Sequence, residues 1–143
     1  MVTWTDLVYA ELPAAFDGLK QSAREIGAIQ IQNKATLVGN ICNASPAADG
    51  VPPLLTLNAQ VELASVGGTR RLPLATFLQG SRQTDKQSDE LVTAILIPDV
   101  SLRGVSSFKK LGFRKSLVIS VSMVAAPLNK DSNKTISVAF VSV

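Results

Sequence analysis

Hydroxyl, amide and carboxylate side chains gather in one stretch of this sequence, between residues 36 and 49. Gly39 would let a ligand approach the backbone closely, and successive N–H groups in such a turn can bind phosphate oxygens. Asp49 can accept hydrogen bonds from sugar hydroxyls. The other polar residues of the stretch are Thr36, Asn40, Asn43 and Ser45. These residue types suit a sugar-phosphate ligand, although plain turn chemistry is the simpler interpretation of the residues taken alone.

The chemistry open to the chain is limited by the residues it lacks. Its 143 residues include no histidine and one cysteine, Cys42. A Ser-His-Asp triad, a Cys-His dyad and a histidine-ligated zinc site are therefore excluded, as are an intrachain disulfide and a four-cysteine metal site. The net charge of +3 is scattered rather than gathered in a stripe, and aromatic residues are few. This pattern argues against nucleic acid as a partner.

Membrane insertion is not indicated by the sequence. The longest uncharged apolar stretch, residues 116–129, has about 14 residues and includes serines and a proline, which is too short to span a bilayer. The first residues lack the basic and apolar regions of a signal peptide. We therefore expect no membrane contact and a cytoplasmic location.

An amphipathic helix is predicted near the start of the chain. Apolar residues recur on one helical face from Leu12 to Ile26. Pro13 suits the first helical position, and Gly27 suits the end. Before this helix, we expect Thr5 to cap a short turn over residues 6–9.

Strands and short helices are predicted for most of the remaining chain. Ile29 and Ile31 alternate with glutamines, which indicates a short strand, and residues 35–50 show neither period, which indicates a loop. The other expected elements are a helix at 51–57, strands at 60–66 and 69–72 around a glycine turn, a helical turn at 73–78, a polar loop at 81–89, strands at 90–97, 105–111, 116–126 and 135–143, and a turn at 129–133. Together they predict an α+β fold: a mixed sheet with helices, followed by a partial antiparallel sheet.

Several blocks of sequence, in order along most of the chain, resemble one known family. Residues 29–41 resemble its run Q-I-R-N-x-G-T-x-G-G-N-I, and residues 44–49 resemble the A-S-P-x-x-D continuation. The later blocks are residues 53–59, similar to P-x-L-L-A-L-D-A, residues 71–77, similar to R-x-V-P-L-x-D-F, and residues 89–98, similar to D-E-L-I-T…I-P. The family is the FAD-binding subunit or domain of molybdenum hydroxylases, which includes the flavoproteins of xanthine dehydrogenase and carbon monoxide dehydrogenase.

The resemblance implies FAD as the cofactor and places most of its ligands in the polar stretch. Thr36, Gly39 and Asn40 would lie at the pyrophosphate and ribityl groups. Asp49 would bind a ribityl or ribose hydroxyl, and Ser45 belongs to the same block.

The flavin ring would be contacted by two further residues, according to the resemblance. Val92 would lie beside the isoalloxazine, and Lys109 would approach the ring, where a cation stabilises the negative charge of reduced flavin. Two residues depart from the family pattern. Gln32 replaces an arginine, and Val38 replaces the first glycine of the G-G-N triplet. Because a β-branched residue adopts positive φ only at a cost, Val38 predicts a distorted phosphate loop.

The resemblance also divides the chain and implies partners. Residues 1–98 resemble a second FAD-binding subdomain and residues 99–143 the beginning of a C-terminal domain, so we expect a chain truncated at both ends relative to the family. It would pass electrons from [2Fe–2S] clusters through FAD to NAD or another acceptor, with molybdenum-cofactor and [2Fe–2S] subunits as partners and no metal ligand of its own. The alternative is a flavin-free remnant that acts only as a structural module and associates, for example as a homo-oligomer, through its final strand.

Overall fold

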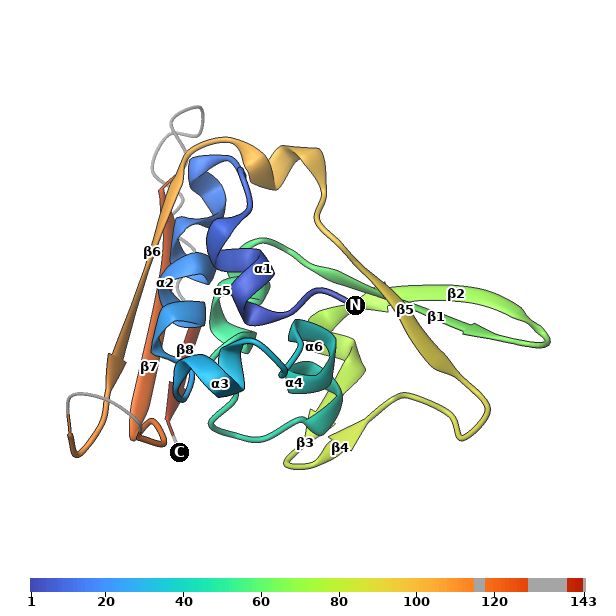
Figure 1. Cartoon of the computed structure of the whole chain (residues 1–143). Helices are drawn as coiled ribbons and strands as arrows, with labels where there is room; N and C mark the ends of the chain where they lie inside the picture. Colours follow the sequence, from blue (N-terminus) through green and yellow to red (C-terminus); the bar gives the residue numbers. More distant parts are fainter. Residues whose placement is uncertain (115–117, 129–138, 143) are drawn as a thin grey trace.

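Two three-stranded antiparallel sheets lie on opposite sides of a group of short helices (Figure 1). The computed structural model describes residues 1–114, 118–128 and 139–142. One sheet has the strand order β2-β1-β5, the other has the order β6-β7-β8, and β3 and β4 form a separate pair. This combination of helices and antiparallel sheets confirms the predicted α+β class.

The elements are short, and their bounds are as follows. The helical elements are α1 (Trp4–Tyr9), η1 (Ala14–Phe16), α2 (Asp17–Glu25), α3 (Ile29–Gln32), α4 (Leu37–Asn43), α5 (Val51–Thr56), α6 (Leu74–Phe77) and η2 (Asp99–Leu102). The strands are β1 (Gln60–Ser65), β2 (Gly68–Pro73), β3 (Leu78–Gly80), β4 (Gln83–Thr84), β5 (Leu91–Leu96), β6 (Val105–Leu111), β7 (Ser122–Leu128) and β8 (Ala139–Ser142). No helix among the described residues is long and apolar enough to cross a membrane.

Helix α1 begins with a capping box formed by Thr3 and Asp6. The Asp6 N–H donates to Thr3 Oγ1 over 3.1 Å, and the Thr3 N–H donates to Asp6 Oδ2 over 2.9 Å. The two hydrogen bonds satisfy backbone donors that a helix start leaves free. The pKa of Asp6 is lowered because its carboxylate accepts hydrogen bonds from the Thr3 N–H and from the Thr3 hydroxyl. The prediction of Thr5 as the cap is wrong, because Thr5 lies within the helix and its hydroxyl donates to Asn33 Oδ1.

The predicted long helix is present as η1 followed by α2, and α2 packs on the β6-β7-β8 sheet (Figure 1). Ser106 of β6 joins the two layers: its Oγ accepts a hydrogen bond from the Gly18 N–H over 2.8 Å and donates to the Ala15 carbonyl over 2.7 Å. A Cβ at Gly18 would lie 3.2 Å from the Ser107 backbone. Glycine therefore permits the close approach of helix and sheet.

The main core lies between the helices and the β2-β1-β5 sheet. Its largest fully buried side chains include Trp4, Leu19, Ile41, Leu54, Leu63, Leu74 and Phe77. A second and smaller cluster, formed by Phe108, Met123 and Ala125, lies on the β6-β7-β8 sheet. The two clusters show that each sheet buries one face.

The strand predicted at Ile29–Gln32 is instead helix α3. The N–H groups of Ile31 and Gln32 both donate to the Ala28 carbonyl, over 2.9 and 3.0 Å. The side chains of Ile29 and Ile31 are 54% and 51% exposed. The alternation of isoleucine with glutamine therefore does not mark a buried strand face, and the prediction fails for that reason.

The second half of the chain follows the prediction more closely. The β1-β2 hairpin turns at Val66 and Gly67, one residue earlier than predicted, and projects away from the helices (Figure 1). The loop predicted at 81–89 contains the two residues of β4, and β7 begins at Ser122, later than predicted. The turn predicted at 129–133 lies outside the described residues, as does part of the last predicted strand.

Candidate functional site

The polar stretch predicted as a loop contains helix α4. The Gly39 N–H donates to Thr36 Oγ1 over 3.0 Å, which caps the helix, and Leu37 and Ile41 are buried one turn apart. The loop prediction is wrong because this cap and this spacing outweigh the low helix propensity of Gly39 and Asn40.

Val38 causes no distortion at the start of α4. It lies within the helix, and the described non-glycine residues with positive φ are Ala44, Asn58 and Arg82. The expected strain at Val38 is therefore not found. A valine fits the right-handed helical backbone without needing the freedom of glycine.

The first turn of α4 is open to a ligand at Gly39. This residue is exposed, and a Cβ built on it would meet, among the described residues beyond its neighbours and its own helix backbone, Thr36 Oγ1 at 3.0 Å. The start of a helix carries partial positive charge from its N–H groups. The arrangement therefore suits an anionic group placed against the backbone.

The segment that follows α4 folds back onto it. Asn40 Oδ1 accepts a hydrogen bond from the Gly50 N–H over 3.3 Å. A Cβ on Gly50 would lie 2.7 Å from Trp4 Cη2, so the segment can pack this closely only with glycine. Ser45 stabilises the intervening turn by accepting a hydrogen bond from the Ala47 N–H over 3.2 Å.

Asp49 is buried, with 7% of its surface exposed, and it is bound by two residues from the C-terminal sheet region. Lys110 Nζ lies 2.7 Å from Asp49 Oδ2, and Ser120 Oγ donates to Asp49 Oδ1 over 2.7 Å. Neither partner appears among the residues predicted for the site. The face alternation of β6, which places Lys110 on the same side as buried Phe108, is the sequence signal that could have indicated Lys110.

Lys109 is not brought to this cluster. It is exposed on the outer face of β6, opposite the face that carries Phe108 and Lys110. Adjacent strand residues point to opposite faces. The lysine next to Asp49 is therefore Lys110.

A mostly apolar groove of about 680 Å³ lies between α1, α4 and β5. Val38 and Val92 are both part of its wall, together with Leu7, Leu37 and Ile95. Leu91, which precedes Val92, is 73% exposed. The groove thus places Val92 on the same surface as the first turn of α4.

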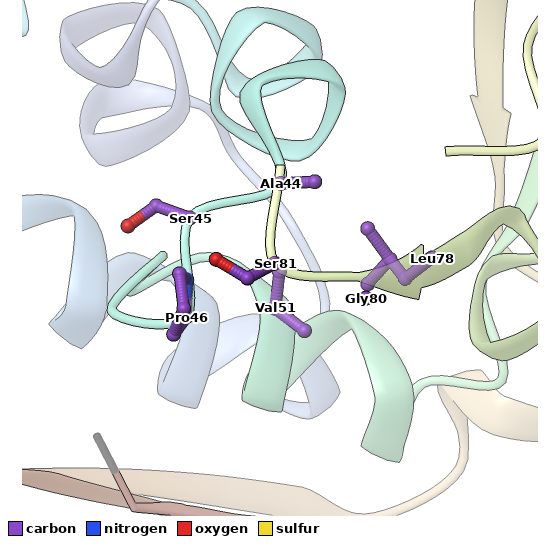
Figure 2. A pocket seen from close by; sticks show the side chains of 7 residues that line it. All are labelled: Ala44, Ser45, Pro46, Val51, Leu78, Gly80 and Ser81. Atoms are coloured by element: carbon purple, nitrogen blue, oxygen red, sulfur yellow. The ribbon is translucent and has the colours of Figure 1, made fainter. Parts of the chain in front are cut away.

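A smaller pocket of about 220 Å³ lies behind the end of α4, where residues 44–46 face residues 78–81 (Figure 2). Ser45 lines this pocket and not the groove. Arg82 joins the two segments, because its N–H donates to the Ala44 carbonyl and its Nη1 to Asn43 Oδ1, both over 2.8 Å. Ser45 and Val92 therefore line different cavities.

Helix α4 thus brings together most of the predicted site residues. Thr36, Gly39 and Asn40 lie on or at the start of the helix, and Ser45 and Asp49 lie on the segment that returns to it. In the part of the chain that the structure describes, no group of three or more Cys, Asp or Glu side chains could hold a metal ion.

The chain is similar in sequence to known proteins. The family model described as "FAD binding domain in molybdopterin dehydrogenase" matches residues 1–100. The nicotinate dehydrogenase FAD-subunit of Eubacterium barkeri is 41% identical over 106 residues, which are 72% of this chain and 36% of that protein. The glyceraldehyde dehydrogenase medium chain of Sulfolobus acidocaldarius is 32% identical over 129 residues, which are 90% of this chain and 44% of that protein.

Solved structures agree with this fold. Reconstituted CO dehydrogenase from Oligotropha carboxidovorans matches with a TM-score of 0.86 and 26% identity, over 97% of this chain and 49% of that one. The carbon monoxide dehydrogenase of Hydrogenophaga pseudoflava that lacks the Mo-pyranopterin moiety matches in fold, with a TM-score of 0.88 at 23% identity, over 99% of this chain and 50% of that one. The chain spans half or less of the length of each of these proteins.

Proposed function

Because the chain belongs to the family of FAD-binding domains in molybdopterin dehydrogenases, we propose that it supplies part of the FAD site of a molybdenum hydroxylase. In that role it passes electrons from [2Fe–2S] clusters through FAD to NAD or another acceptor. FAD is the cofactor of the family, and the chain is an oxidoreductase component. Its partners are the molybdenum-cofactor and [2Fe–2S] subunits, and its place of action is the cytoplasm.

The single observation that carries this proposal is the position of α4 beside the apolar groove. The first turn of α4 is accessible at Gly39 and suits a diphosphate, because a helix start attracts negative charge. Val38 and Val92 both line the groove, which suits a flat aromatic ring. A phosphate-binding end next to an apolar wall fits the two chemically different parts of FAD.

The positions of Thr36, Asn40 and Val92 suggest a role for each of them in the proposed FAD site. Thr36 holds the first turn of α4 through its hydrogen bond to Gly39. Asn40 is held by the Gly50 N–H and is proposed to face the ribityl side. Val92 excludes water from the ring and contacts it with a branched apolar side chain. When bound, FAD supplies the redox chemistry by taking up electrons and releasing them to an acceptor.

Three proposed ligands, Asp49, Ser45 and Lys109, are not among the residues that line the groove. Asp49 uses one oxygen for Lys110 and one for Ser120, and a carboxylate has additional lone pairs with which it can bind a ribityl hydroxyl. Ser45 faces the small pocket. The role of Lys109 at the flavin ring remains a prediction, and the outer face of β6 does not support it.

We also propose the division into residues 1–98 and 99–143. The family match ends at residue 100, and η2 begins at Asp99. The second part still contributes to the site, since Lys110 and Ser120 bind Asp49 from beyond that boundary.

A second candidate function is association without flavin. Exposed apolar side chains at Leu111, Phe113 and Leu128, which are 64%, 94% and 57% exposed, favour it. Exposed apolar surface of this kind commonly marks contact sites. Sedimentation of the purified chain that gave a stable dimer, with no FAD bound at any concentration, would support this candidate over the first.

The first proposal is tested by titrating the purified chain with FAD and following flavin fluorescence. We expect weak but saturable binding, because the chain spans half or less of its relatives' length. Val92→Asp should abolish saturation by placing a charge in the apolar groove, whereas the matched Val92→Leu should retain it. In the complex assembled with its partner subunits, FAD should be present, and a complex that transfers electrons fully without flavin absorbance would overturn the proposal.

A further inference from the structure

The Asp49 carboxylate is held from both sides by residues that lie beyond the segment matched by the family. Its Oδ2 is 2.7 Å from Lys110 Nζ, and its Oδ1 accepts the Ser120 hydroxyl over 2.7 Å. The side chains of Lys110 and Asp49 are only 6% and 10% exposed. Both oxygens are therefore fixed, and the carboxylate has a single position relative to the C-terminal sheet.

Burial makes this ion pair sensitive to the loss of either partner. Removing two charges from water costs free energy, which close contact and extra hydrogen bonds offset. Here Ser120, which is 2% exposed, supplies the extra hydrogen bond. An Asp49 that lost Ser120 or Lys110 would be drawn toward water, and the backbone attached to it would move.

That backbone leads directly to α4. Gly50 follows Asp49, and its N–H donates to Asn40 Oδ1 over 3.3 Å. A Cβ on Gly50 would lie 3.0 Å from the same Asn40 oxygen and 3.3 Å from Leu37 Cδ1. Gly50 therefore contacts the first turn of α4. A shift of Asp49 would move Gly50, and this movement would displace the first turn of α4.

We propose that Lys110 and Ser120 are positioning residues for the flavin site: by fixing Asp49, they fix Gly50 and through it Asn40 and the first turn of α4. This inference rests on the proposed function for its link to FAD, while the mechanical link stands on the described contacts. It makes the C-terminal sheet part of the site although none of the described residues of that sheet lines the groove.

The test uses single variants of the full chain. Ser120→Ala removes one hydrogen bond to Asp49 and keeps the ion pair, so it should fold. Ser107→Ala is the matched control, because Ser107 carries an exposed hydroxyl on the outer face of β6 that bonds to Gln21. Leu72→Ala is the stability control, since it removes a buried side chain from β2, in the other three-stranded sheet.

Two measurements are made on each variant. The first is amide hydrogen exchange at Gly50 and Asn40, which needs no ligand. The second is the dissociation constant for FAD, from fluorescence titration. We expect Ser120→Ala to speed exchange at both amides and to weaken FAD binding, each by about tenfold, which matches the worth of a hydrogen bond to a charged group.

The controls decide the outcome. Ser107→Ala should leave both quantities unchanged, and Leu72→Ala should lower global stability without a selective change at Gly50 and Asn40. Unchanged exchange in Ser120→Ala would overturn the inference, and so would an equal local effect of Leu72→Ala. If the unmodified chain and the assembled complex bind no FAD, the proposed function fails, and the exchange result still decides whether Ser120 positions α4.

Discussion

Arg70 holds Glu90 with two nitrogens: Nε lies 2.6 Å from Oε1, and Nη2 lies 2.9 Å from Oε2. The same guanidinium donates to the side chain and the carbonyl of Asp85, over 2.7 and 2.6 Å. The Gln87 N–H adds a hydrogen bond to Glu90 Oε2 over 2.8 Å. This cluster attaches the β1-β2 hairpin to the start of β5, and Arg70 is the main reason why the pKa of Glu90 falls from 4.5 to about 2.

Acid should weaken the fold through Glu90. A carboxylate whose pKa is lower in the folded chain than in the unfolded chain contributes stability above the unfolded pKa. That stability is lost as the pH falls from 4.5 toward about 2. Urea unfolding measured from about pH 6 to about pH 3 should show this decrease in the free energy of unfolding.

Glu90→Gln provides the comparison, because it removes the titration and keeps the shape. The difference in unfolding free energy between wild type and Glu90→Gln should be greatest near neutral pH and should shrink as the pH falls. Asp6 and Glu62 also have lowered pKa values, and they titrate in both proteins. A difference that stays constant over the whole range would contradict the role given to Arg70.

Gly50→Ala should destabilise the chain. The new Cβ would meet Trp4 Cη2 at 2.7 Å, and overpacking of this kind costs about 1–3 kcal/mol. Gly67→Ala is the control, since its Cβ would meet only Ser65 Oγ at an ordinary 3.6 Å. Denaturant unfolding should separate the two variants, and equal stabilities would show that Trp4 can move aside.

Two adjacent lysines should differ sharply in their effect on stability. Lys110→Met leaves the buried Asp49 carboxylate without its cation, which costs about 3–5 kcal/mol. Lys109→Met changes an exposed position on the opposite face of the same strand, where substitutions cost within about 0.5 kcal/mol. The melting temperatures of the two variants test this, and similar values would mean that the faces of β6 are assigned incorrectly.

Thr36→Ala should loosen α4 at the end where we propose that FAD binds. The hydroxyl that accepts the Gly39 N–H is lost, and loss of a threonine cap costs about 1 kcal/mol. FAD binding should weaken as well, because the first turn is no longer held. Thr36→Ser keeps the oxygen and should behave like the wild type in both unfolding and FAD titration. A serine variant as impaired as the alanine variant would point to the methyl group instead of the cap.

The sequence predicted the larger elements well where one pattern dominated. The β1-β2 hairpin follows from strand alternation around Gly67 and Gly68, and α2 follows from one apolar helical face. Helix α4 was missed although its signals were present. Thr36 stands at the cap position, with Leu37 and Ile41 one turn apart, but Gly39 and Asn40 suggested a loop.

The cluster around Asp49 could not have been predicted in the same way. Asp49 and Lys110 are 61 residues apart, and Asp49 and Ser120 are 71 apart. No local preference links such positions, because only the packing of β6 and β7 on the helices brings them together. The family resemblance predicts that Asp49 is a ligand of FAD, and it gives no sign of Lys110 and Ser120, which hold Asp49.

The hydrogen bond between Gly18 and Ser106 also sets an order of events when the chain is made. The two residues are 88 positions apart, and ribosomes add about 5–20 residues per second. Roughly 4 to 18 seconds therefore pass between the synthesis of α2 and the synthesis of β6, the strand that covers it. During that interval the face of α2 that carries Gly18 and Ser22, which are buried in the finished fold, is open to chaperones.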